Sequence, residues 1–280
     1  MWPIWPAAGR PGRLTRRRRA SVHLSDVLLP ALGVLTGLVL GLLGSGGSSL
    51  ALPAFLLGAG LPMSQAVPAS LAVVAATALF GALLARRRCV TVGCPGSEAD
   101  LRTAALFGAG GVVSAFAGAR LALLLSDRVQ ALLFVAILLA AAAAMLRSPG
   151  RPLHPTEASP PPRWIMVVLG AGVGLLTGLL GVGGGFLIVP ALTLAGGMPI
   201  KRASATSLWI ITAQAVVGLA GYVGRVHIPW GSVGLFILAG AVGMAIGQAM
   251  ARRARPGPLR TAFAGLLVVV ALMTAVKALA

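Results

Sequence analysis

The chain has 280 residues, of which 58% are hydrophobic and 10% are charged. A soluble protein of this length needs a polar exterior that this composition cannot supply, so we expect a membrane protein. The net charge of +18 does not indicate nucleic-acid binding. The basic residues lie in short clusters between apolar runs, without interleaved aromatic residues, as is typical of loops at a membrane surface.

The N-terminal residues 1–23 are rich in proline and arginine, and we expect them to form a disordered cytoplasmic tail. The cluster Arg16–Arg19 precedes an uncharged run, as in a signal peptide, but no cleavage site with a polar mature segment follows. We therefore interpret the run as an uncleaved first span. Because arginine resists translocation, the cluster predicts a multi-pass protein of the cytoplasmic (inner) membrane with its N-terminus in the cytoplasm.

Two long runs without Asp, Glu, Lys, Arg or His dominate the chain: Val27–Ala85, with 59 residues, and Trp164–Ile200, with 37. One helical crossing takes about 20 apolar residues, so the first run holds two crossings and the second holds one, each with a remainder. We predict eight spans. One is the second crossing of the first run, and the other seven are Val27–Leu43, Thr103–Leu125, Val129–Leu146, Trp164–Leu180, Ala203–Val223, Ser232–Met250 and Thr261–Val276.

The chain also repeats itself at a distance of 137 residues. Without a gap, 17 of 35 positions from Gly37 to Leu71 are identical to their partners from Gly174 to Leu208. We therefore predict an all-α membrane protein with two homologous four-helix repeats, residues 24–147 and 164–280, each interrupted by a glycine- and proline-broken segment. The proline-rich stretch 148–163 is expected to link them.

Charge leaves the topology of the second half open. With eight crossings and a cytoplasmic N-terminus, most basic residues of the second half fall on the outer side, against the usual bias. They are Lys201, Arg202, Arg252, Arg253, Arg255 and Arg260, against Arg225 and Lys277 on the inner side. An odd number of crossings per repeat would invert the second half and remove this conflict. Whether the glycine and proline segments cross the membrane or re-enter it decides between these topologies.

The two broken segments, Gly44–Pro53 and Gly181–Pro190, are the strongest functional signal. Clustered glycines weaken a helix, and backbone N–H groups that lose their partners at membrane depth need a polar one. The short helix that restarts after each cluster directs its positive N-terminal end at the same place. We therefore expect an anion to bind between the two segments near the bilayer midplane; the alternative is a re-entrant hinge that only packs. The candidate substrate-binding residues are Gly46, Gly47, Ser48, Ser49, Pro53, Ser70, Gly183, Gly184, Gly185, Pro190, Thr206, Ser207 and Arg120.

Charged side chains inside the spans are few. No acidic residue lies inside a predicted span, which disfavours a carboxylate-based cation site or proton relay. Arg120 lies inside one, as a counter-ion for the anion or as a side chain that reaches the nearby interface. We expect no catalytic residue, no metal site and no cofactor, because Cys89 and Cys94 cannot complete a four-ligand zinc site and the three histidines lie at span ends or in loops. The expected partners are the small anion and the lipid bilayer, not nucleic acid, and a homo-oligomer stays open.

The string Gly181-Val-Gly-Gly-Gly-(x)4-Pro190, its variant copy at Gly44–Pro53 and the stretch Ala203–Leu208 resemble the TauE/SafE sulfite exporter family. The resemblance implies about eight helices from a duplicated four-helix unit, and transport of sulfite, sulfonates or related organosulfur anions. It agrees with a secondary transporter that works by alternating access and is not an enzyme. The alternatives are a non-transporting membrane scaffold or assembly subunit, and an anion channel. The identity of the anion, the direction of transport and the coupling ion stay open.

Overall fold

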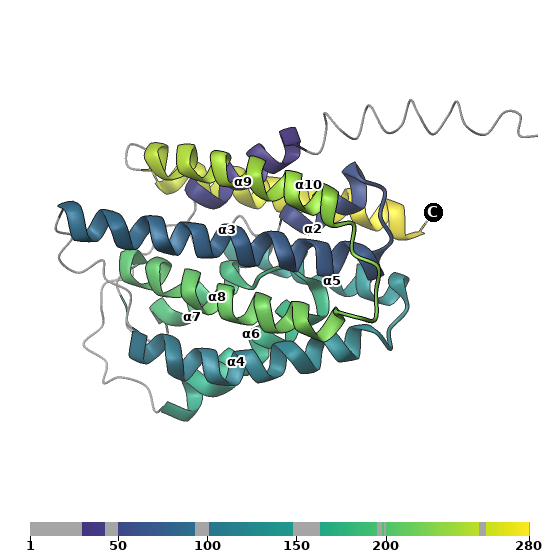
Figure 1. Cartoon of the computed structure of the whole chain (residues 1–280), viewed down its shortest axis with the longest axis horizontal. Coiled ribbons are helices and arrows are strands. Elements are labelled where there is room, and N and C mark those ends of the chain that lie inside the picture. The colour runs from purple at the N-terminus through teal and green to yellow at the C-terminus, as the bar shows by residue number, and fades with distance from the viewer. Residues whose placement is uncertain are drawn as a thin grey trace, which may run out of the picture.

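The computed structural model describes residues 30–42, 50–92, 101–147, 163–194, 198, 200–251 and 256–279. Over these residues the regular elements are helices (Figure 1), so the predicted all-helical fold is confirmed. Helices suit a chain this apolar, because they satisfy every backbone hydrogen bond within one segment.

Each half begins with an interrupted helix and continues with three long ones. In the first half, the helix Pro30–Leu42 is followed by the short α2 (Ala51–Pro53) and the π-helix η2 (Ala54–Gly58), and then by the long helices α3 (Met63–Val92), α4 (Leu101–Ala122) and α5 (Asp127–Arg147). In the second half, α6 (Arg163–Leu180) and α7 (Gly185–Leu194) are followed by α8 (Ile200–Tyr222), α9 (Trp230–Ala251) and α10 (Pro256–Leu279).

The long helices agree in position with the predicted spans. They have between 21 and 30 residues, which at about 1.5 Å per residue matches a hydrocarbon core of about 30 Å. Four of them are long and apolar enough to cross a membrane by length and composition: α3, α4, α8 and α9. The helices at the predicted opening spans are shorter than these long helices over the described residues. They are Pro30–Leu42 and Trp164–Leu180.

The opening helix of each half packs against a helix of the other half. In α6, Gly170, Gly174 and Gly178 lie against the backbone of α4, where a β-carbon on any of them would overlap a carbonyl oxygen. The helix Pro30–Leu42 makes the same contact with α9 through Gly37 and Gly41. Small residues allow such close approach in membrane bundles. The two halves are therefore interleaved.

These contacts also fix the direction of the helices. Along α6 and α4, Gly170 lies beside Phe107 and Gly178 beside Ala115, so the two helices run parallel. Their C-terminal ends lie near the start of α3, because Gly181 is beside Val67. We name the two ends of the bundle after α3: the Met63 end, which includes the C-terminal residues marked at the right of Figure 1, and the Arg86 end.

The second half runs opposite to the first. In the first half, Pro30–Leu42, α3 and α5 run toward the Arg86 end, whereas their counterparts α6, α8 and α10 run toward the Met63 end. The contact of Gly240 in α9 with Thr77, and that of Gln214 in α8 with Gly111, agree with these helix directions. Over the described residues the repeat is therefore inverted, with three long helices per half, and this odd number puts Arg86 and Arg87 of the first half and Arg202 of the second half at the same end of the bundle.

The interrupted helices fold back instead of crossing. A β-carbon on Gly184, after the break, would lie 2.7 Å from Val173 Cγ1 and 2.6 Å from Thr177 Oγ1 in α6, so the chain has turned back along the helix that precedes it. In the first half, Gly33 lies before the break and Phe55 after it, and both contact Phe236 of α9. The centres of the Phe55 and Phe236 rings are 5.0 Å apart, and a β-carbon on Gly33 would lie against the Phe236 backbone. Each interrupted helix is thus a hairpin that returns to its own end of the bundle.

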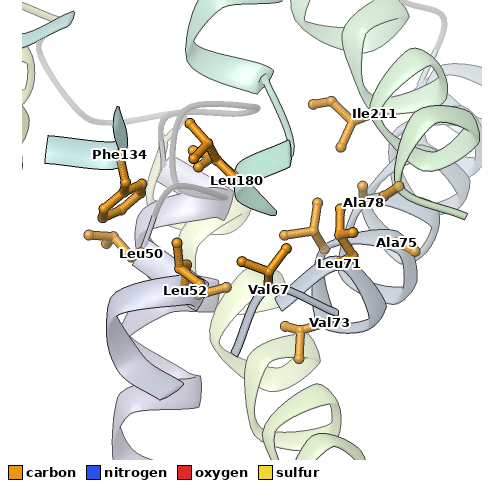
Figure 2. Packing of buried hydrophobic residues seen from close by; sticks show 14 of the residues in the cluster. Leu50, Leu52, Val67, Leu71, Val73, Ala75, Ala78, Phe134, Leu180 and Ile211 are labelled. Atoms are coloured by element: carbon orange, nitrogen blue, oxygen red, sulfur yellow. The ribbon is translucent and has the colours of Figure 1, made fainter. Parts of the chain in front are cut away.

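Buried side chains from both halves form one apolar cluster at the centre. Figure 2 shows Leu180, the last residue of α6, grouped with Val67 and Leu71 of α3 and with Leu50 and Leu52 from the first hairpin. The hairpins are therefore part of the core and do not lie on its surface.

The glycine contacts yield a test of this packing. We expect Gly174→Ala to destabilise the protein by about 1–3 kcal/mol, the usual range for overpacking, because its new methyl group would meet the carbonyl of Gly111. Gly172→Ala on the same helix is the matched control, since nothing lies within 4 Å of its added β-carbon. Thermal unfolding in detergent measures both. Equal melting temperatures for the two variants would contradict the interleaved packing.

Candidate functional site

The candidate site is built on the glycine break between α6 and α7. Gly181, Gly183 and Gly184 have φ angles of 68°, 69° and 60°, in the left-handed region that glycine enters without the steric cost of a β-carbon. Three such residues within four positions end α6 and reverse the chain. The cluster that the sequence marked as a weakened helix is therefore a tight reversal, with α7 beginning at Gly185.

Backbone hydrogen bonds close both helix ends at the break. The Gly181 N–H donates to the Thr177 carbonyl at 2.8 Å, and the N–H groups of Leu187 and Ile188 both donate to the Gly184 carbonyl at 2.9 Å. Gly181 to Gly185 are buried. A reversal at this depth has to satisfy its polar groups within the protein.

A hydroxyl from the other half contacts the break. Ser70 of α3 is fully buried, and its Oγ lies 2.9 Å from the Gly181 carbonyl oxygen and 2.7 Å from the Val67 carbonyl oxygen. A hydroxyl has one hydrogen to donate, so the two acceptors share it. The predicted residue Ser70 thus joins the first repeat to the break of the second.

A second buried polar pair lies one turn before the break. Thr177 Oγ1 donates to the Val173 carbonyl at 2.9 Å and lies 3.5 Å from Gln214 Oε1 on α8. Both side chains are fully buried, and Gly184 lies against the same threonine hydroxyl. Three helical segments therefore place hydroxyl, amide and backbone groups around one point in the core.

The other predicted residues have separate surroundings. Thr206 and Ser207 are buried in α8, where Ser207 Oγ donates to the Ser204 carbonyl of its own helix at 2.8 Å. Pro53 is buried at the end of α2, and Pro190 lies within α7. The predicted residues Gly46, Gly47, Ser48 and Ser49 lie outside the described residues, and with them the first break.

Arg120 is apart from the break. It occupies the last turn of α4, at the Met63 end, and its guanidinium carbon lies 5.0 Å from the centre of the Phe116 ring. The Phe116 side chain is exposed on the outside of the bundle. This geometry matches the side chain that reaches the interface, the second of the two interpretations of Arg120 from sequence.

The sequence analysis did not select Thr177 and Gln214 as candidates. Two signals could have found them. Gln214 is an amide inside an apolar span at the repeat position of Thr77, and Thr177 lies one turn before the glycine cluster. Both were hidden because a polar residue in a membrane helix commonly bonds to its own backbone.

Comparison with known proteins identifies the class of protein. A curated protein of Xylella fastidiosa strain 9a5c, named probable membrane transporter protein, is 29% identical over 223 residues, which cover 79% of this chain and 83% of that protein. Its counterpart in strain Temecula1 is 30% identical over 225 residues, with the same coverage. The Bacillus subtilis protein YunE, also named a probable membrane transporter, is 27% identical over 230 residues, covering 74% of this chain and 81% of its own. With its apolar helical bundle, the chain is a membrane transporter.

The family follows from a match over most of the length. The model of the family described as sulfite exporter TauE/SafE matches residues 29–274. The chain belongs to this family, as its two glycine and proline strings had indicated. No solved structure matches it.

The serine contacts yield a second test. We expect Ser70→Ala to lower the unfolding free energy by about 1–3 kcal/mol, because the Gly181 carbonyl would lose a donor in the core. Ser207→Ala, at the equivalent repeat position, removes a bond within one helix and is expected to cost less than about 1 kcal/mol. Denaturant unfolding in detergent micelles compares them. A Ser207→Ala variant as unstable as Ser70→Ala would show that the contact with the break contributes nothing.

Proposed function

We propose that the protein is a secondary carrier that moves a small anion (sulfite, a sulfonate or a related organosulfur anion) across the cytoplasmic membrane. The observation that carries this proposal is the buried reversal Gly181–Gly184, which lies between the two halves and beside the hydroxyl of Ser70. Family membership supports the same cargo class, because the family is described as sulfite exporter TauE/SafE.

The chemistry around the reversal favours an anion. The start of α7 at Gly185 directs the positive end of a helix dipole toward the break, and Ser70 and Thr177 add hydroxyls. Among the described residues the one carboxylate is that of Asp127, at the start of α5, where its Oδ1 accepts from the Ser64 N–H at 3.2 Å. Positive dipole ends and hydroxyls without carboxylates suit an oxyanion better than a cation.

We propose that the carrier works by alternating access. The inverted halves support this mechanism, because exchange of conformation between two inverted repeats exposes one central site to each side in turn. Each half holds a hairpin of the other through glycine contacts, so movement of one half relative to the other would shift both breaks together. The substrate-binding set would then comprise Gly183, Gly184 and Gly185 with Ser70 of α3, and Thr206 and Ser207 at the turn of α8 that corresponds to Ser70 in the repeat.

Counterflow in proteoliposomes tests transport. Vesicles preloaded with sulfite should take up labelled sulfite in a saturable manner, with sulfoacetate and sulfate as competitors. We expect Gly184→Ala to reduce the rate by about tenfold or more, since displacement of a binding group by about 1 Å has effects of that size. Gly224→Ala is the matched control, because Gly224 also has a positive φ, 77°, but nothing within 4 Å of an added β-carbon.

Each other outcome selects an alternative function. Uptake that neither saturates nor responds to preloading would indicate an anion channel. Absence of uptake by folded protein over the whole set of anions would favour the scaffold function, in which the glycine reversals only pack. Equal activity of Gly184→Ala and Gly224→Ala would place the site away from the break.

We further propose that the Arg86 end faces the cytoplasm. In the described helices, nine basic residues lie toward this end and four toward the Met63 end. Those at the Arg86 end are Arg86, Arg87, Arg88, Arg102, Arg147, Arg163, Lys201, Arg202 and Arg260, and those at the Met63 end are Arg120, Arg128, Arg225 and Lys277. Basic residues accumulate on the cytoplasmic side, so this excess favours a cytoplasmic Arg86 end. The start of the helix Pro30–Leu42 and the end of α10 would then lie outside. It reverses the expectation drawn from Arg16–Arg19.

Reporter fusions decide the orientation. Alkaline phosphatase fused after Ala280 should be active, and green fluorescent protein at the same place should be dark, since both report an exported C-terminus. Fusions after Arg147, at the Arg86 end, should give the opposite pair of signals. A fluorescent C-terminal fusion would restore the cytoplasmic N-terminus and show that the N-terminal arginines dominate.

A further inference from the structure

A cavity of about 250 Å³ lies at the Met63 end of the bundle, the end where Figure 1 marks the C-terminus. It is lined by residues of the first hairpin and the loop after it, of the starts of α3 and α5, and of the last two turns of α10. Both halves therefore contribute to it. The cavity is separate from the Gly181–Gly184 break, because Met63, which lines it, precedes Ser70 by two turns of α3, about 10 Å along the helix.

Charged side chains lie at the mouth of this cavity. Arg128 in the first turn of α5 and Lys277 in the last turn of α10 are exposed, as is Asp127 beside Arg128. Asp127 Oδ1 accepts from the Ser64 N–H at 3.2 Å, and among the described residues no ion pair joins Asp127 to either cation. Two cations and one carboxylate leave the mouth with an excess of positive charge, which attracts anions.

The two cations have hydrogens to offer a ligand. Lys277 Nζ donates to the Leu56 carbonyl of η2, so this side chain connects two walls of the cavity instead of extending to the membrane surface, as lysines at helix ends commonly do. An ammonium has three hydrogens and a guanidinium has five N–H donors. At least two donors of Lys277 and those of Arg128 are therefore available at the mouth.

The inner wall of the cavity is apolar. Leu56, Met63 and Ala131 line it and are buried. Thr274 is buried there too, but its hydroxyl donates to the Val270 carbonyl at 2.8 Å, so its hydrogen is committed within α10. Donors for an anion are thus confined to the mouth, and the inside suits hydrocarbon.

The size of the cavity limits what can occupy it. Sites for small molecules usually have about 300–1,000 Å³, so a space of about 250 Å³ suits a ligand of few heavy atoms. The acyl chain of a lipid would extend well beyond it. An inorganic anion would use the charged mouth and leave the apolar wall without a contact. A short organic chain with one anionic group uses both parts.

We propose that this cavity binds an organosulfonate with a short apolar chain. The sulfonate oxygens accept hydrogen bonds from Lys277 and Arg128, and the chain packs on Leu56, Leu61 and Ala131. The choice of ligand rests on the proposed function, which this inference deepens: the cavity is a second site that holds the substrate at the Met63 end, two turns of α3 away from the break. With the Arg86 end in the cytoplasm, the cavity opens to the outside.

The test is the binding of 1-propanesulfonate to the full-length protein in uncharged detergent, measured by isothermal titration calorimetry. We expect Arg128→Gln and Lys277→Gln each to raise Kd by about fivefold or more, because each removes a charged hydrogen bond at a partly open site. Arg225→Gln is the matched control, since Arg225 is exposed at the same end but does not line the cavity. Equal Kd values in wild type, Arg128→Gln and Lys277→Gln would overturn the proposal.

Chain length tests the apolar wall. Each methylene buried contributes about 0.8 kcal/mol, so every carbon added from methanesulfonate to 1-propanesulfonate should lower Kd by up to about fourfold. Equal affinity for the two sulfonates would show that the chain stays outside the cavity and would overturn the proposal.

Melting in the absence of ligand separates binding from support of the fold. Lys277→Gln is expected to lower the melting temperature, because the Leu56 carbonyl loses its donor, whereas Arg128→Gln should melt as the wild type does. A lower melting temperature of Lys277→Gln with unchanged Kd would leave this lysine a structural role only and would overturn its part in the site. Arg128→Gln then still tests the cavity, since its folding does not depend on that bond.

Two competing results identify a different ligand or place. If phosphatidylglycerol in the micelles binds in a manner that depends on Lys277 and Arg128, and 1-propanesulfonate does not, the cavity is a site for a lipid headgroup and the proposal is wrong. If 1-propanesulfonate binding is lost in Gly184→Ala and unchanged in Arg128→Gln, the sulfonate binds at the break and not in the cavity.

Counterflow distinguishes this inference from the function on which it rests. Sulfite counterflow without binding of 1-propanesulfonate that depends on Arg128 would overturn the second site and leave the carrier intact. Binding that depends on Arg128 and Lys277, without counterflow of sulfite or of any sulfonate, would overturn the carrier and keep the cavity as a ligand site.

Discussion

Close contact between helix backbones of opposite halves is the constraint on which this structure depends. In lipid there is little hydrophobic gain from bringing two apolar helices together, so their association relies on packing and on polar contacts. The glycines of α6 on α4, and those of the helix Pro30–Leu42 on α9, supply that packing. The parallel course of these pairs sets the direction of every other helix, and with it the inversion of the second half.

The same contacts explain how a reversal can be tolerated deep in the protein. A turn in lipid would expose carbonyl and N–H groups that nothing could satisfy. Here the surrounding helices supply the partners: Ser70 reaches the Gly181 carbonyl from α3, and the Tyr222 hydroxyl reaches the Gly178 carbonyl from α8 at 2.8 Å. The break is therefore enclosed by groups whose hydrogen bonds are committed.

The sequence predicted the helical class, the positions of the long helices and the family. It predicted these well because length and apolar composition decide whether a segment can span a bilayer. It left open whether Trp164–Leu180 and its continuation cross or return, since composition is the same for both. That choice depends on the φ angles of Gly181, Gly183 and Gly184 and on their neighbours, which are tertiary properties.

The candidate residues divide in the same way. Ser70 and its repeat counterpart Ser207 were both predicted from the sequence, but only the three-dimensional contacts distinguish them: one hydroxyl reaches the break and the other bonds to its own helix. Gln214 was visible as a polar residue in an apolar helix, but its position beside Thr177 and Gly111 depends on how α8 packs against α6 and α4.

The reciprocal exchange of opening helices has a consequence for biosynthesis. Gly37 contacts Gly240, a residue 203 positions later in the chain, whereas Gly174 contacts Gly111, which has already been made when α6 leaves the ribosome. The α4–α6 pair can therefore form during translation, but the first helix has to wait in the membrane until α9 is inserted. The earliest segment to be made is among the last to find its place, so its glycine-lined face is exposed to lipid or to insertion factors for most of the synthesis of the protein.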